Sequence, residues 1–100
     1  MLYEILVTPI ALDMMKGFQK NVRDKMKYQI GELSEEPEKK GKPCWGELKG
    51  MLSTHVAGRY RIVYRIREQK VEILAAGIRK KGDENDIYQL TKKLIRAKLI

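Results

Sequence analysis

Four side chains in the second half of the sequence could together cleave a phosphodiester bond: His55, Arg61, Arg79 and Tyr88. A histidine titrates near neutral pH, so His55 could take a proton from a ribose 2′-hydroxyl or give one to the leaving 5′-oxygen. Arg61 and Arg79 carry a permanent charge and can bind two oxygens of a pentavalent phosphate at once. Tyr88 could stack on a base or donate a proton. These residue types meet the needs of an RNA-cleaving site that uses no metal ion.

His55 and Tyr88 also have a structural interpretation. A lone histidine on a strand is more often solvated than catalytic, and Tyr88 beside Ile87 could pack at the edge of the core. The sequence has no Gly-rich phosphate loop, no carboxylate pair of clear geometry and no metal-ligand spacing, and Cys44 is its one cysteine. We therefore expect no metal site and no cofactor, and spacing alone leaves the enzyme interpretation open.

A strand rich in arginine runs through this region. Residues 59–67 read Arg-Tyr-Arg-Ile-Val-Tyr-Arg-Ile-Arg, and the two-residue period of a strand divides them into an apolar face and a cationic face. Four guanidiniums on one side of a strand repel each other, so a bound polyanion is the simplest reason to keep them. Beyond the four candidate catalytic residues, the basic side chains that we expect to bind RNA are Lys49, Arg59, Arg65, Lys80 and Lys81.

The charge of the whole chain agrees with a polyanionic partner. The formal net charge is +8, and residues 51–100 hold 12 Lys and Arg against 5 Asp and Glu. A positive surface of this kind accelerates association with polyanions without specifying which one. No apolar stretch approaches the ~20 residues that span a bilayer, so we expect no membrane association, and the single cysteine suits the cytoplasm.

The sequence pattern predicts seven segments along one α+β domain over residues 1–100. We expect a strand at 2–8, a helix at 10–33 with a possible break at Gly17, and an ordered surface loop at 34–50 that Trp45 pins to the body. Three strands at 51–57, 59–67 and 70–77 and a helix at 83–99 follow. The order βα(α)βββα predicts a largely antiparallel four-stranded sheet with a helical hairpin and a C-terminal helix packed on one face.

The turn between the first two of those three strands decides where His55 points. A two-residue turn would set the apolar side of one strand against the cationic side of the next. A three-residue turn, Ala57-Gly58-Arg59, pairs Val56 with Tyr60 and brings every apolar residue to one face. In that register His55 lies beside Arg61, and Met51 beside Arg65.

Several short motifs of the chain resemble the RelE/ParE superfamily of bacterial and archaeal type II toxins. They are Leu48-Lys49-Gly50, the run Gly-Arg-Tyr-Arg-Ile-Val-Tyr at 58–64, Gly77-Ile78-Arg79, and Tyr88 at the start of the last helix. The lead-in Glu-Glu-Pro-Glu-Lys-Lys-Gly-Lys-Pro at 35–43 is also similar, and the resemblance covers essentially the whole chain.

The resemblance implies a small basic toxin that an acidic antitoxin from the same operon neutralises, forming a hetero-oligomer. It favours the RelE-like branch, whose members cleave messenger RNA in the ribosomal A site and in which Arg61, Arg79 and Tyr88 match site positions. The best-known members carry lysines on the strand before that of Arg61, and this chain has none there. His55 could take their place, with Lys49 or Lys80 supplying charge. The alternatives are a ParE-like inhibitor of DNA gyrase and a weakened toxin that mainly binds its antitoxin.

Overall fold

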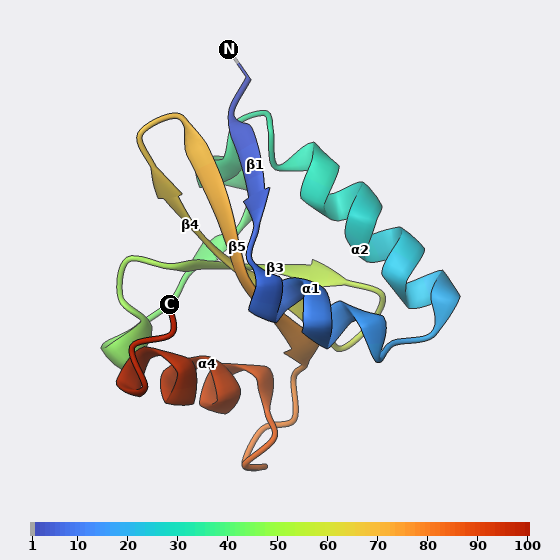
Figure 1. Cartoon of the computed structure of the whole chain (residues 1–100), viewed down its shortest axis with the longest axis vertical. Coiled ribbons are helices and arrows are strands. Elements are labelled where there is room, and N and C mark those ends of the chain that lie inside the picture. Colours follow the sequence, from blue (N-terminus) through green and yellow to red (C-terminus); the bar gives the residue numbers. More distant parts are fainter. Residues whose placement is uncertain (1) are drawn as a thin grey trace.

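The computed structural model describes residues 2–100 and shows one five-stranded sheet with helices on both sides (Figure 1). Its elements are β1 (Glu4–Val7), α1 (Pro9–Lys16), α2 (Lys20–Glu32), α3 (Pro37–Lys40), β2 (Lys42–Pro43), the 3-10 turn η1 (Gly46–Leu48), β3 (Leu52–Val56), β4 (Tyr60–Arg67), β5 (Lys70–Ile78) and α4 (Ile87–Arg96). The strand order is β1-β5-β4-β3-β2, and only the β1–β5 pair is parallel. The predicted α+β class is confirmed, with a short fifth strand, β2, that the sequence did not indicate.

The N-terminal helical hairpin begins and breaks where local chemistry requires. The Thr8 hydroxyl caps α1 by accepting from the N–H of Ala11 at 3.2 Å, and Pro9 occupies the first helical position. Gly17 ends α1, so the predicted break is confirmed. Helix α2 then lays Val22, Met26 and Ile30 against the sheet, at the three- and four-residue steps of an amphipathic helix.

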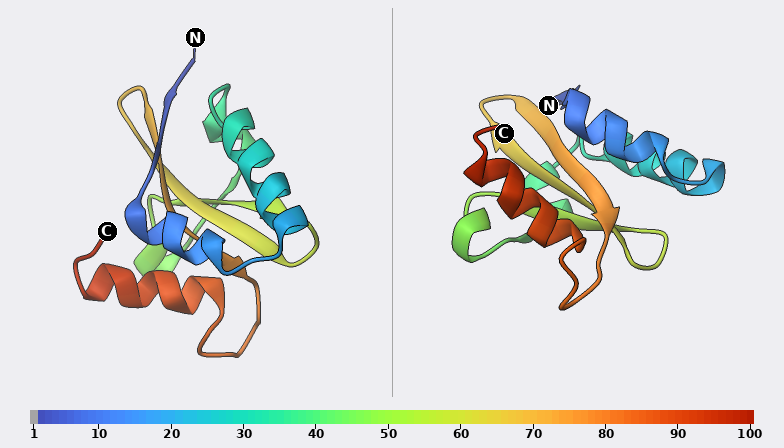
Figure 2. Two further views of the ribbon diagram at one scale, coloured as in Figure 1. Left: turned by 45° about the vertical axis from the view of Figure 1, so that its right-hand side comes forward. Right: turned by 60° about the horizontal axis from the view of Figure 1, so that its bottom comes forward.

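Helices cover both faces of the sheet, so the prediction that they share one face is wrong (Figure 2). Helices α1 and α2 pack on the face that carries Ile62, Tyr64 and Ile73, while α4 and η1 pack on the opposite face. The reason lies in β5, an inner strand that carries buried apolar side chains on both faces. Each face therefore needs helices to cover it. A bulge at Leu74, between the pairs Val63–Ala75 and Tyr64–Ile73, turns an extra apolar side chain toward α4.

The predicted hairpin register is confirmed along β3 and β4. Val56 pairs with Tyr60, and His55 with Arg61. The three-residue turn places Ala57 at φ 39° and Gly58 at φ 72°, in the left-handed region that such hairpin loops use. The ladder ends at Leu52 and Tyr64, so the predicted pairing of Met51 with Arg65 is not part of it.

Two details of the C-terminal half of the prediction also need correction. Helix α4 begins at Ile87 and not at Asp83, because the Asp86 carboxylate caps it by accepting from the N–H of Tyr88. Trp45 does not pin the 34–50 segment, since 79% of its surface is exposed. The buried hydroxyl of Tyr64 holds that segment instead, by donating to the Pro37 carbonyl at 2.7 Å. Among residues 2–100, no helix combines the length and apolar character needed to cross a bilayer.

Candidate functional site

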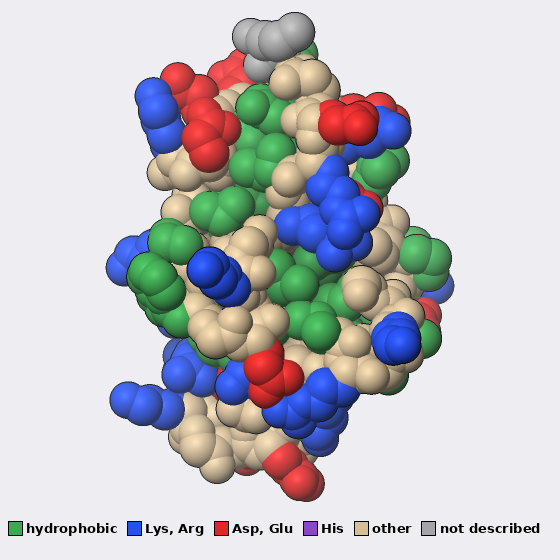
Figure 3. All heavy atoms as spheres, turned by 90° about the vertical axis from the view of Figure 1, so that its left-hand side faces the viewer, with side chains coloured by type: hydrophobic (Ala, Val, Ile, Leu, Met, Phe, Trp, Pro, Cys, Tyr) green, Lys and Arg blue, Asp and Glu red, His purple; other side chains and the backbone are tan. Residues whose placement is uncertain are grey.

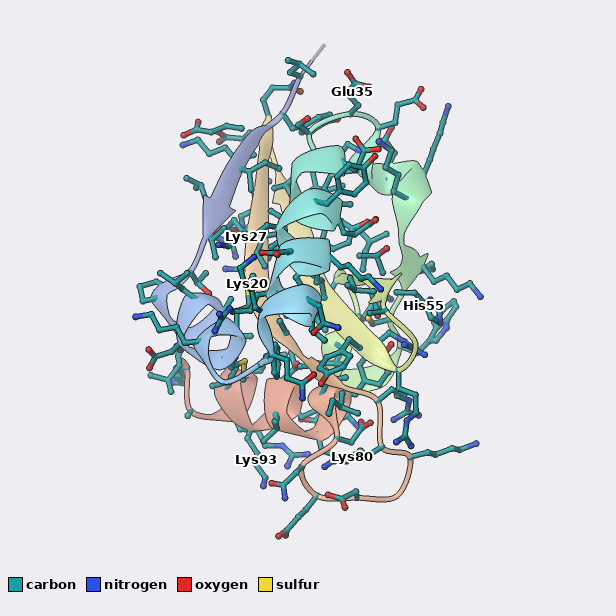
Figure 4. The ribbon with its side chains drawn as sticks, turned by 90° about the vertical axis from the view of Figure 1, so that its right-hand side faces the viewer. Lys20, Lys27, Glu35, His55, Lys80 and Lys93 are labelled. Carbon is teal, nitrogen blue, oxygen red and sulfur yellow. The ribbon has the colours of Figure 1, made fainter. Side chains whose placement is uncertain are left out.

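A pocket of about 390 Å³ lies between β3, the 42–48 segment and the start of α4. Three of the four predicted catalytic residues, His55, Arg79 and Tyr88, line it. They come from three parts of the fold: the second half of β3, the residue after β5, and the first turn of α4. The fold brings them together because α4 returns across the sheet face that carries His55, and Figure 4 shows His55 extending outward from β3.

Arg79 is fixed by an ion pair with a buried carboxylate. Its guanidinium lies 2.7 Å from Asp86 Oδ2, and the Asp86 side chain is fully buried. Asp86 also accepts from the backbone N–H of Lys80 at 2.6 Å and of Tyr88 at 3.0 Å. Burial opposes ionisation of Asp86, but the hydrogen bonds from Arg79, Lys80 and Tyr88 outweigh it and lower the pKa of the carboxyl. One carboxylate therefore orients the arginine and starts the helix at the same time.

Tyr88 is held at two points. Its ring lies against the Arg79 guanidinium, with 4.7 Å from the guanidinium carbon to the ring centroid, which is a cation–π contact. Its hydroxyl is 2.7 Å from Ser53 Oγ on β3. The sequence placed Tyr88 one turn into the helix, whereas it is the second residue of α4. Both contacts keep the phenol at the wall of the pocket.

His55 is exposed, and its surroundings favour the neutral imidazole. Neighbouring atoms still displace some of the water around the ring, and this desolvation lowers the pKa of His55. The positive charges of Arg61 and Lys42 lower that pKa further. An imidazole that is mostly unprotonated at neutral pH can accept a proton. The register of the β3–β4 hairpin explains the contribution of Arg61 to this lowered pKa, because it sets Arg61 opposite His55.

Arg61 is near His55 along the sheet but does not line the pocket. Its Nη1 donates to the carbonyls of Gly58 at 3.1 Å and Tyr60 at 3.0 Å, so the side chain folds back on the turn. A guanidinium has five N–H donors, and these two bonds use one nitrogen. The remaining donors stay available to an anion that approaches from the side of His55.

The predicted RNA-binding residues lie outside the pocket. Arg59 is exposed in the 57–59 turn, and Lys49 follows η1. Lys80 and Lys81 are exposed in the β5–α4 loop, and Figure 4 shows Lys80 well apart from His55. Lys and Arg side chains also gather over the lower half of the face in Figure 3, toward that loop.

The prediction of four mutually repelling arginines along residues 59–67 is wrong for the far end of that strand, β4. Arg65 Nε lies 2.7 Å and Arg67 Nε 3.5 Å from Glu72 Oε1 on β5, so an internal acid partly balances both. Val63 interrupts the cationic face and is buried under α4. Only the end of the strand near His55 keeps its positive charge unbalanced.

Several residues of the site were not recognised from the sequence. The sequence predicted a helix that begins at 83 and did not single out Asp86, which caps the helix and pairs with Arg79. Ser53, Lys42, Trp45, Gln89 and Lys92 also line the pocket. Ser53 and Lys92 follow the strand and helix periods of His55 and Tyr88, whereas Lys42, Trp45 and Gln89 join the pocket only through tertiary packing. Within residues 2–100, no group of three or more His, Cys, Asp or Glu is placed to hold a metal ion.

Solved structures define the class of protein that shares this architecture. Free RelE toxin of Escherichia coli, in a mutant form, superimposes with a TM-score of 0.74 over 96% of this chain and 98% of RelE, at 18% identity. The RelBE2 toxin–antitoxin complex of Mycobacterium tuberculosis contains a chain that is 31% identical, with a TM-score of 0.69 over 78% of this chain and 92% of that one. The YoeB–YefM complex of Staphylococcus aureus gives 0.64 at 19% identity, over 78% and 98%.

The family model described as the ParE toxin of the type II toxin–antitoxin system parDE matches residues 5–81. The chain therefore belongs to the ParE toxin family of type II toxin–antitoxin systems, within the RelE/ParE superfamily. A comparison with curated proteins returned no match.

Proposed function

We propose that this protein is the toxin of a type II toxin–antitoxin pair and acts in the cytoplasm as a ribosome-dependent, metal-independent endoribonuclease that cleaves messenger RNA. The observation that carries the proposal is the pocket in which His55, Arg79 and Tyr88 meet, with Arg61 opposite His55 on the neighbouring strand. A proton acceptor, a fixed cation and a phenol in one pocket are what cleavage through the ribose 2′-hydroxyl needs.

The reaction assigns one role to each group. His55 takes the proton of the 2′-hydroxyl as the 2′-oxygen attacks the adjacent phosphorus. The bond from phosphorus to the 5′-oxygen breaks, and Tyr88 gives that oxygen a proton, leaving a 2′,3′-cyclic phosphate on the upstream fragment. Arg79 and Arg61 stabilise the extra negative charge of the pentavalent phosphate.

The electrostatics of the pocket support these roles. The lowered pKa of His55, due to burial and to Arg61 and Lys42, keeps the imidazole ready to accept a proton at neutral pH. The Asp86 carboxylate holds Arg79 in place before substrate arrives, so no ordering is needed at the moment of reaction. The site lies within one small domain. We propose that the ribosome holds the message in position for cleavage.

We further propose an acidic antitoxin as the partner that neutralises this protein. The net charge of +8 makes an acidic chain complementary to it. The RelBE2 structure is a toxin–antitoxin complex, which supports the same arrangement here.

The proposal is tested by mixing purified protein with ribosomes programmed with a defined message and mapping cleavage by primer extension. We expect cleavage within the codon in the A site. Substituting His55→Ala should slow cleavage by about 10²–10⁴-fold, the range for losing a general base. Arg79→Ala should slow it by about 10²–10³-fold.

Arg67→Ala is a matched control for Arg61→Ala. Arg67 lies on β4, as Arg61 does, but at the far end of the strand, and its side chain is 63% exposed. This variant should cleave normally. Full activity of His55→Ala, Arg61→Ala and Arg79→Ala would refute the site. Intact transcripts in growth-arrested cells, together with DNA damage signalling, would instead support the gyrase-inhibitor alternative.

A further inference from the structure

Trp45 is the one tryptophan of the chain, and 79% of its surface is exposed at the rim of the pocket. Indole is among the largest apolar side chains, and an isolated protein gains nothing by leaving it in water. The other apolar side chains that line the pocket from this loop are more protected, since Leu48 is buried and Cys44 is half-buried. Trp45 is therefore the large apolar side chain that this loop leaves in water beside the pocket.

The backbone that carries Trp45 is well fixed. The N–H of Cys44 donates to the Met51 carbonyl at 2.9 Å, and the carbonyl of Trp45 accepts from the N–H of Leu48 at 3.2 Å. Gly46 follows with φ 64°, a turn conformation that favours glycine. Trp45 thus sits on a rigid loop with a free side chain, which suits a flat platform for a ligand.

Cations stand beside this platform. Lys42 pairs with Ser53 across β2 and β3, so it lies on the side of the sheet that carries His55. Lys92 lies one helical turn after Tyr88, at the i,i+4 spacing that places both on one side of α4. A large aromatic ring flanked by lysines is the combination that binds single-stranded nucleic acid through base stacking and phosphate contacts.

We propose that Trp45 stacks on the nucleobase next to the phosphate held at His55 and Arg79, with Lys42 and Lys92 binding the flanking phosphates. The inference rests on the proposed ribonuclease function and names the residue that selects among bases. A purine offers the larger ring for stacking, so this subsite binds adenine more tightly than uracil.

Trp45 itself reports on the test, because all tryptophan fluorescence of the protein comes from it. The probes are 2′-O-methyl hexanucleotides of adenine or uracil, which lack the attacking hydroxyl and cannot be cleaved, and an abasic strand of the same length. We expect the adenine strand to quench Trp45 emission strongly, the uracil strand less, and the abasic strand hardly at all. Equal quenching by all three would overturn the proposal.

Binding of the labelled adenine strand to variants gives the second readout, by fluorescence anisotropy. Trp45→Leu should weaken binding about 10-fold and leave the salt dependence unchanged, since only stacking is lost. Lys92→Gln should weaken all strands and reduce the salt slope by about 1. Tyr28→Leu, a change at an aromatic residue on α2 that is 71% exposed, should change neither. Unchanged affinity in Trp45→Leu would refute the subsite.

The two proposals fail separately. Base-dependent quenching without message cleavage would support the Trp45 subsite and refute the ribonuclease function. Cleavage by Trp45→Leu at the normal rate and codons, without quenching in the original protein, would remove the subsite alone.

Discussion

The substitution Asp86→Ala tests whether one buried carboxylate organises the C-terminal part of the fold. It removes the cap of α4, the ion-pair partner of Arg79 and the acceptor for the Lys80 N–H in a single step. The substitution does not touch the sheet, so its effect reports on this cluster.

The magnitude follows from the contacts that are lost. Loss of an N-cap costs about 1 kcal/mol, and an unmade charge-assisted hydrogen bond about 1.5–3 kcal/mol. The Arg79 side chain is 32% exposed, so water recovers part of that second cost. We expect a loss of about 3 kcal/mol in the free energy of unfolding, which corresponds to a drop in Tm of roughly 12–24 °C for a domain of this size.

Urea unfolding followed by circular dichroism at pH 7 measures this loss. Asp83→Ala is the matched control, because Asp83 carries the same charge in the same loop, is exposed, and has a side chain that accepts from the Asn85 N–H alone among residues 2–100. The control should change stability by less than about 0.5 kcal/mol. Equal unfolding midpoints for the two variants would refute the reasoning.

The pH dependence of the difference is a second check. Against the opposing effect of burial, hydrogen bonds lower the pKa of Asp86 below its ordinary 3.8 in the folded state. Its stabilising contribution is therefore complete above pH 3.8 and is lost as the pH falls through the lower, folded pKa. The gap between the original protein and Asp86→Ala should narrow on acidification below pH 3.8 and stay constant above it.

Three further outcomes follow from the geometry. Burial and then the charge of Arg61 lower the pKa of His55, so removing that charge in Arg61→Gln should raise the pKa. The acid limb of the pH–rate profile for cleavage should then move to higher pH. An unmoved limb would argue against His55 as the base. Tyr64→Phe should cost about 1–2 kcal/mol by leaving a buried carbonyl unpaired. Burial raises the pKa of Tyr64 to about 12 from 10, so the original protein should lose stability as the pH rises from 10 toward 12 and the variant should not. Gly41→Ala should cost about 1–3 kcal/mol in urea unfolding, because its Cβ would overlap the Tyr64 hydroxyl, whereas Gly31→Ala, with open space around the new Cβ, should be neutral or stabilising.

The alternation of residue types was enough to predict the sheet register. The apolar side chains at Val56, Tyr60 and Ile62 agree with a single turn length, so His55 could be set beside Arg61 from the sequence. The position of α4 could not be predicted in the same way. Its site on the second face depends on Val63 and on the Leu74 bulge, and a bulge has no sequence signature in a run that is apolar throughout.

The candidate site was predictable only in part. Arg79 and Tyr88 were identified from their chemistry and then from the resemblance to a toxin family, whereas Asp86 was not recognised as the partner of Arg79. Trp45 was expected to be buried because most tryptophans are largely buried. Whether an aromatic side chain in a loop points inward or outward depends on the backbone around it, and sequence periodicity says nothing about that.

The parallel pairing of β1 with β5 affects when the chain can fold during synthesis, because it joins two segments that lie far apart in the sequence. Glu4 pairs with Lys70, and the Thr8 hydroxyl donates to the Ile73 carbonyl 65 residues away. The pocket needs Tyr88 from α4 in addition. A growing chain can therefore complete its sheet only after β5 has been synthesised, and it can assemble its pocket only after α4 has followed. A nascent chain that still lacks α4 therefore has no assembled pocket, even when its sheet has formed.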